Sequence, residues 1–216
     1  MDFGMEVDDV RGARPGAYRG VRIVPFAPSH VKWIARMHSE SLTGLLASLG
    51  PWAVRAYYAG ASQAPEAVGY VAYDGEHVVG FVLGSAHPAE LRRQIAQLNR
   101  KALLASVARG LISRPYLLWW LVRSRRGPAE GTYDSVGPEL IYLAVLRDVR
   151  GSGTGRLLVE AFGEAIKRRG ADAYELSVDD TNTSAIGFYE KLGFRAVGRY
   201  REFGIWHRRY RLELIS

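Results

Sequence analysis

The sequence contains no cysteine in its 216 residues. This absence excludes disulfide-stapled scaffolds, zinc sites with cysteine ligands and catalysis by a thiolate. Long apolar runs are also missing, because the longest, at residues 116–122, is far too short to cross a bilayer. The N-terminus is acidic and lacks the apolar segment of a signal peptide. We therefore expect a soluble, cytoplasmic protein whose chemistry depends on oxygen and nitrogen groups, a cosubstrate or positioning alone.

Positive charge is concentrated in one part of the chain. The formal net charge is +7, and residues 88–127 hold nine basic residues against a single acidic one, Glu90. The basic residues are Arg92, Arg93, Arg100, Lys101, Arg109, Arg114, Arg123, Arg125 and Arg126. The rest of the chain is close to neutral, so this excess needs a local explanation. A basic balance favours partners that carry phosphate, such as a cofactor, an anionic membrane or nucleic acid.

Hydrophobic periodicity predicts an α/β protein with a mixed sheet. We expect residues 1–18 to be a flexible lead-in and residues 19–216 to form a single domain. The expected strands are residues 20–24, 67–73, 77–83, 140–146, 174–178, 194–200 and 206–215. Helices are expected after Pro28, over residues 45–58 with an interruption near Gly50, after the loop at residue 155, and over residues 183–192. The basic segment, residues 87–127, reads as a helical insertion between the third and fourth strands, broken at Gly110 and again at Arg114-Pro115.

A glycine-rich loop joins an apolar strand to an amphipathic helix. It consists of Arg150, Gly151, Ser152, Gly153, Thr154, Gly155 and Arg156. Glycines let successive backbone N–H groups converge on one point, and a helix N-terminus adds positive dipole character there. The loop is therefore a candidate cradle for pyrophosphate, although a flexible turn is an equally simple interpretation. It is not a Walker A loop, and Arg156 stands where the dinucleotide fingerprint requires glycine.

Two motifs in order resemble those of the GNAT N-acetyltransferase superfamily. Arg150-x-x-Gly153-x-Gly155 resembles the cofactor motif of that family. The stretch from Val178 to Phe194, with Asn182, Ala185 and the run Phe188-Tyr189-Glu190-Lys191-Leu192-Gly193-Phe194, resembles its next signature. The resemblance covers residue 140 to the end of the chain, and implies a twisted sheet that opens between its fourth and fifth strands to hold acetyl-CoA.

The resemblance also implies roles for individual residues. The backbone of Arg150, Gly151, Ser152, Gly153, Thr154 and Gly155 would bind the cofactor pyrophosphate. Leu143, Ala144 and Val145 would hold the pantetheine arm and polarise the thioester carbonyl. Asn182 would bond to the same arm, although Asn before a helix is also a common cap. Tyr189 would protonate the departing thiolate, although its helical spacing also suits a core aromatic.

The family resemblance implies direct attack of an amine on the thioester, with no metal. Glu139 is the candidate base, either as such or through water, although it could also be an exposed loop carboxylate. Glu40 and His38 are weaker candidates, and His38 suits a packed helical position better.

The basic insertion leaves several interpretations open. It could be a solvated lid or homodimer contact. It could attract a phosphate-bearing acceptor, such as a nucleotide-linked amino sugar, or rest on an anionic membrane. Nucleic acid is not expected, because the aromatic residues cluster instead of alternating with charges. The expected function is acetyl transfer to a primary amine of a small molecule. The alternatives are a membrane-surface module that binds acyl-CoA and an enzyme that acetylates peptides.

Overall fold

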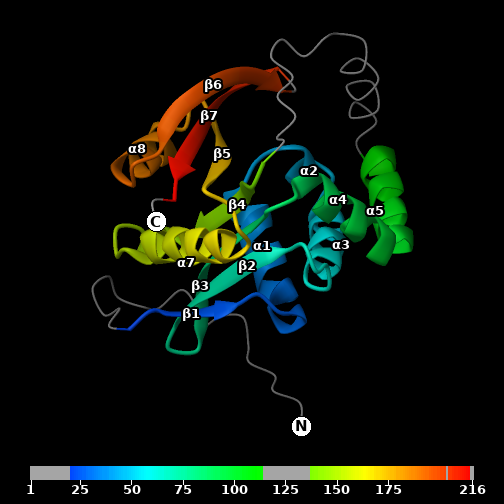
Figure 1. Ribbon diagram of the computed structural model, residues 1–216. Coiled ribbons are helices and arrows are strands. Elements are labelled where there is room, and N and C mark those ends of the chain that lie inside the picture. The colour runs from blue at the N-terminus through cyan, green and yellow to red at the C-terminus, as the bar shows by residue number, and fades with distance from the viewer. Residues whose placement is uncertain (1–19, 114–136, 203, 215–216) are drawn as a thin grey trace.

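The computed structural model describes residues 20–113, 137–202 and 204–214. Seven strands form one sheet in the order β1-β2-β3-β4-β5-β7-β6 (Figure 1). All neighbouring strands are antiparallel except β4 and β5, which are parallel. The strands are β1 (Arg22–Pro25), β2 (Val68–Asp74), β3 (His77–Ser85), β4 (Glu139–Val145), β5 (Ala173–Asp179), β6 (Arg195–Glu202) and β7 (Ile205–Glu213). The expected mixed α/β fold is confirmed.

Helices cover both faces of the sheet. They are α1 (Val31–Ser41), α2 (Leu45–Ser48), α3 (Pro51–Ala61), α4 (Pro88–Leu98), α5 (Arg100–Ser113), α7 (Thr154–Arg168) and α8 (Thr183–Lys191), with 3-10 turns at Pro28–His30 and Arg147–Val149. One core cluster joins α7 and α8 to the sheet, and a second joins α1, α3 and α4 to the other face. Among the described residues, no helix is long and apolar enough to cross a membrane.

The basic segment is helical over the part that the structure describes, but not with the expected break. The interruption falls at Asn99, whose side-chain amide donates to the carbonyl of Ala56 at 2.8 Å. The break predicted at Gly110 is wrong, since α5 continues through it to Ser113. A Cβ at Gly110 would lie 2.8 Å from the carbonyl oxygen of Leu49. Gly110 therefore serves close helix packing and not helix termination. The break expected at Arg114-Pro115 lies outside the described residues.

A β-bulge in β4 determines which side chains face α1 and α3. Gly84 of β3 pairs with Leu140, whereas the preceding Leu83 pairs with Tyr142, so Ile141 is an extra residue in β4. A bulge of this kind redirects side chains and increases local twist. Both Ile141 and Tyr142 consequently pack against the α1 and α3 cluster.

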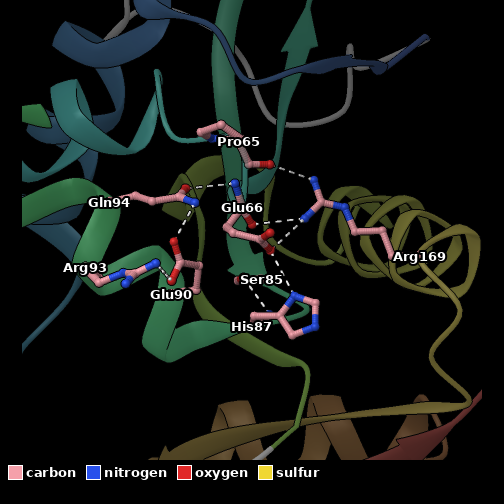
Figure 2. Close-up of polar contacts among 8 residues, drawn as sticks. All are labelled: Pro65, Glu66, Ser85, His87, Glu90, Arg93, Gln94 and Arg169. Carbon is pink, nitrogen blue, oxygen red and sulfur yellow. Dashed lines mark hydrogen bonds and ion pairs between the residues drawn. The ribbon is translucent and has the colours of Figure 1, made fainter. Parts of the chain in front are cut away.

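Polar contacts tie the basic segment to the rest of the fold (Figure 2). Arg169, just after α7, donates to the carbonyl oxygens of Pro65 and Glu66 at 3.1 Å each. The Glu66 carboxylate contacts Nδ1 of His87 at 3.1 Å, and the Glu66 N–H donates to Gln94 of α4 at 3.1 Å. These contacts link the end of α7, the connection before β2 and the first insertion helix.

His38 is a buried core residue, as its position in the sequence of the helix predicts. Its side chain is 0% exposed, and Nδ1 lies 2.8 Å from the hydroxyl of Tyr58. Burial lowers the pKa of His38 from 6.5 to about 4. In the unfolded chain the imidazole takes up a proton near pH 6.5, but the folded protein keeps it neutral to about pH 4.

This difference predicts acid sensitivity. Stability that is fully present above pH 6.5 should fall between pH 6.5 and about pH 4, by about 3 kcal/mol for this group. Urea unfolding of the wild type and His38→Gln at pH 7 and pH 4.5 measures the contribution. The wild type should lose more free energy of unfolding than the variant; an equal loss in both would contradict the assignment.

Candidate active site

The sheet opens between β4 and β5, as the sequence motifs led us to expect. These strands pair only at Glu139 with Glu175 and at Leu140 with Leu176, and then separate. Two consecutive pairs form the closed end of a wedge whose open end lies toward Val145 and Asp179.

The backbone of β4 directs alternate polar groups into this opening. The N–H of Leu146 donates to Val79, the residue opposite it on β3, at 2.9 Å. In an antiparallel ladder, hydrogen-bonded and non-hydrogen-bonded pairs alternate. The register therefore directs the N–H and C=O groups of Leu143 and Val145 away from β3, toward the gap. Ala144 pairs with Phe81 of β3, so its backbone polar groups face the opposite way.

The glycine loop lies just beyond the open end of β4. Gly151 and Gly153 have φ angles of +86° and +91°, which residues other than glycine rarely adopt. Gly155 has a different role, because a Cβ there would lie 3.2 Å from the ring of Phe188. Two glycines thus allow the turn, and the third allows α7 to approach α8 closely.

Several donors of this loop are available to an anion. Within the described residues, no hydrogen bond occupies the N–H groups of Gly151, Gly153, Gly155 and Arg156. Arg150 is exposed, and its Nε donates to the carbonyl of Val145 at 3.3 Å. Arg156 instead pairs with Glu160 at 2.7 Å. The loop therefore offers unpaired backbone donors at the N-terminus of a fifteen-residue helix, a setting suited to phosphate.

Loop side chains support this turn. Ser152 bonds to the carbonyl of Val149 at 2.7 Å and to the hydroxyl of Thr154 at 2.8 Å. Thr154 is buried. These hydroxyls hold the loop conformation, so the groups of the loop that are left available to an anion are its backbone N–H groups.

Helix α8 carries two of the residues predicted from the sequence, Asn182 as its N-cap and Tyr189 within it. The side chain of Asn182 accepts from the N–H of Ala185 at 3.1 Å, which makes it the N-cap of α8. Tyr189 is 7% exposed, and its ring packs edge-on against Phe188 and Phe194. Burial raises the pKa of Tyr189 well above that of free tyrosine, so its phenol stays protonated at neutral pH.

Glu139 is not the exposed loop carboxylate that we considered as an alternative. It is the first residue of β4, its side chain is 15% exposed, and it contacts Arg209 of β7 at 2.5 Å. Arg209 also contacts Glu175 at 2.8 Å. The candidate base therefore belongs to an ionic cluster at the closed end of the opening.

Several groups around Glu139 carry no signal in the sequence. Coulombic effects of Glu139 help to raise the pKa values of Tyr57, Tyr142 and Tyr200, in each case after burial as the main cause. Glu202 of β6 acts on Tyr142 and Tyr200 in the same direction. No local motif marks these residues, because their proximity depends on sheet register and helix packing.

Glu40 lies at a separate cavity. It pairs with Arg36 at 2.9 Å on the exposed side of α1. A cavity of about 280 Å³ adjoins this pair, between α1, the tip of the β2–β3 hairpin and Leu146. Because Leu146 directly follows β4, this cavity lies near the open end of the wedge. Among the described residues, no group of three or more His, Asp or Glu could hold a metal ion.

Comparisons with known proteins agree with this geometry. A sequence model of the acetyltransferase (GNAT) domain matches residues 118–196. Peptidyl-lysine N-acetyltransferase YjaB of Salmonella typhimurium is 37% identical over 82 residues, which cover 38% of this chain and 52% of that protein. Mycothiol acetyltransferase of Thermobispora bispora is 41% identical over 66 residues, covering 31% of this chain and 22% of that protein. The chain thus spans about half the length of the first curated relative and less of the second.

The structural likeness extends over nearly the whole chain. The crystal structure of Ard1 from Thermoplasma volcanium superposes with a TM-score of 0.58 and 17% sequence identity, covering 92% of this chain and 100% of that one. At this identity the likeness concerns the fold. The sequence matches cover the glycine loop and α8, and both these matches and the likeness in fold are to acetyltransferases.

Proposed function

We propose that the protein is an N-acetyltransferase that moves an acetyl group from acetyl-CoA to a primary amine. The observation that carries this proposal is the wedge between β4 and β5. Backbone groups of Leu143 and Val145 face its interior, and beyond its open end lie the unpaired N–H groups of Gly151, Gly153, Gly155 and Arg156. An extended arm bearing a pyrophosphate matches this arrangement, since the phosphate would meet the helix N-terminus.

In the proposed reaction, the amine attacks the thioester directly. A backbone N–H from the β4 edge polarises the carbonyl, where a fixed dipole is most effective as negative charge develops. Glu139 takes the proton that the amine loses, directly or through water. Tyr189 gives a proton to the departing thiolate of CoA. The C–S bond breaks as the C–N bond forms, and the products are an amide and free CoA.

We propose a small-molecule amine as the acceptor, and this proposal is supported by the likeness to a relative named mycothiol acetyltransferase. A phosphate-bearing amine remains the form suggested by the basic insertion. In the described part, however, Arg93 is paired with Glu90 and Arg109 stacks on Trp52. A peptide amine is the second candidate, favoured by the likeness to peptidyl-lysine N-acetyltransferase YjaB.

A calorimetric titration with acetyl-CoA tests the cofactor half of this proposal, with ATP and NADH as controls. Selective binding of acetyl-CoA should be followed by a screen of amines that includes amino sugars, their nucleotide-linked forms and lysine peptides. Preference for ATP or NADH would overturn the proposal.

The glycine loop provides a sharper test through Gly153→Val. A β-branched residue at φ +91° costs of the order of 1–3 kcal/mol in strain, so we expect affinity for acetyl-CoA to fall about tenfold or more. Gly170→Val is the matched control, because Gly170 has φ +84° at the far end of α7. Calorimetry should show weaker binding for the first variant only. Equal affinities for acetyl-CoA in the two variants would show that the loop is not part of the binding site.

A further inference from the structure

Arg209 is a buried cation shared by two carboxylates at the closed end of the wedge. Its side chain is 3% exposed. Nη1 donates to Glu139 at 2.5 Å and to the hydroxyl of Ser177 at 2.9 Å, while Nε donates to Glu175 at 2.8 Å. Glu139 and Glu175 are themselves register partners in the first pair that joins β4 to β5. One guanidinium therefore fixes the two strands at the point from which they diverge.

The two carboxylates of this cluster change the pKa of Arg209. Burial alone would lower the pKa of Arg209, but Glu139 and Glu175 more than offset that effect and raise it. A buried charge is tolerated when it is paired and hydrogen-bonded, so Arg209 stays charged and holds both carboxylates in place. Arg211 also contacts Glu175, at 3.5 Å, so Arg209 is shared by both carboxylates while Arg211 adds a second cation beside Glu175.

We infer that Arg209 is a positioning residue, which orients the Glu139 carboxylate beside the reacting amine, and that Glu175 competes with Glu139 for the same guanidinium. This inference rests on the proposed function, in which Glu139 accepts a proton. An opposite charge beside a carboxylate favours its ionised form and a like charge disfavours it, so loss of Arg209 and loss of Glu175 should act on the pH dependence of kcat in opposite directions. The other charged or titratable groups that face Glu139 or its neighbours are Tyr57, Arg92, Tyr142, Tyr200, Glu202 and Arg211.

The test compares pH profiles of kcat at saturating amine and acetyl-CoA. Arg209→Met should move the acid limb to higher pH by about one unit or more, because an opposite charge at this distance has been lost. Glu175→Gln should move the same limb to lower pH. Shifts in opposite directions cannot come from a general loss of packing, which would lower kcat in both variants without such a pattern.

A conservative variant separates charge from geometry. Arg209→Lys keeps the cation but cannot donate from two nitrogens in a rigid fork. We expect the acid limb to stay near that of the wild type, while kcat falls by about 10²-fold through misplacement of Glu139. Calorimetric affinity for acetyl-CoA should be unchanged in every variant, which also confirms that each one is folded.

Each outcome decides the inference. If Arg209→Met does not fold, Glu175→Gln decides alone, since it leaves the Arg209 contact with Glu139 in place. An acid limb that is unmoved in Glu175→Gln, or that moves the same way in both variants, would overturn the positioning role while leaving acetyl transfer intact. If the wild-type protein binds no acetyl-CoA and acetylates no amine, the proposed function itself is overturned.

Discussion

Tyr189→Phe should lower kcat by about 10²-fold or more while leaving affinity for acetyl-CoA within twofold of the wild type, as expected for loss of a general acid. The reason lies in the surroundings of the phenol. The ring is held edge-on by Phe188 and Phe194, contacts that phenylalanine reproduces, so the substitution removes only the hydroxyl. Because burial raises the pKa of Tyr189, the phenol should carry its proton throughout the neutral range.

Tyr174→Phe is the matched control for this experiment. Tyr174 is also a buried tyrosine, and burial raises its pKa as well. Its hydroxyl makes only a long contact of 3.5 Å with the carbonyl of Val159. We expect kcat of this variant to stay within a few-fold of the wild type. Steady-state kinetics and calorimetry on both variants decide the matter: similar losses in kcat and in affinity for Tyr189→Phe would mark a purely structural tyrosine.

Gly84→Ala should be the most destabilising single methyl addition that we can identify. An added Cβ would overlap the carbonyl oxygen of Glu139 and would lie 2.6 Å from the ring of Phe162. The first of these neighbours is backbone within the β4 bulge, so it cannot rotate away as a side chain can. Overpacking costs typically about 1–3 kcal/mol and occasionally more, and we expect Gly84→Ala to lie at or above the upper end of this range. We also expect kcat to fall, because the displaced backbone carries Glu139.

Gly198→Ala is the control on another strand. Its added Cβ would make only an ordinary contact, 3.9 Å from Cβ of Arg209. Chemical unfolding should show a change within about 0.5 kcal/mol for this variant. If Gly84→Ala were equally mild, the close approach of β3 to β4 would not be required, and the bulge would have to be more adaptable than its contacts indicate.

The sequence predicted most of the elements because their signals are local. The Asp74-Gly75 turn lies between β2 and β3 as expected, with Gly75 at φ +58°. The helical break near Gly50 is also present, between α2 and α3. The break expected at Gly110 was wrong because a helix propensity cannot reveal that the residue packs against Leu49. Propensity is overridden where two helices approach each other closely.

The candidate site residues also fall into two groups, those that contiguous motifs mark and those that only packing brings together. The glycine loop and the signature from Val178 to Phe194 are each continuous segments of sequence, so their order alone indicated the resemblance to the GNAT superfamily. The surroundings of Glu139 could not be predicted, because Arg209 is 70 residues away in the chain and Tyr57 belongs to another helix. A lone glutamate before a strand has the same sequence appearance whether it is exposed or held by a buried cation.

The sequence by itself determined the order of strands and helices, and its motifs indicated a candidate anion-binding loop from Arg150 to Arg156 and a resemblance to the GNAT superfamily. These properties depend on backbone preferences and spacings within short segments. Only the tertiary structure decided where β4 and β5 part, that Ile141 forms a bulge, and that Glu139 and Glu175 share Arg209. The physical reason is that register and burial are set by packing between segments far apart in the chain, and the charge state of a carboxylate follows from both.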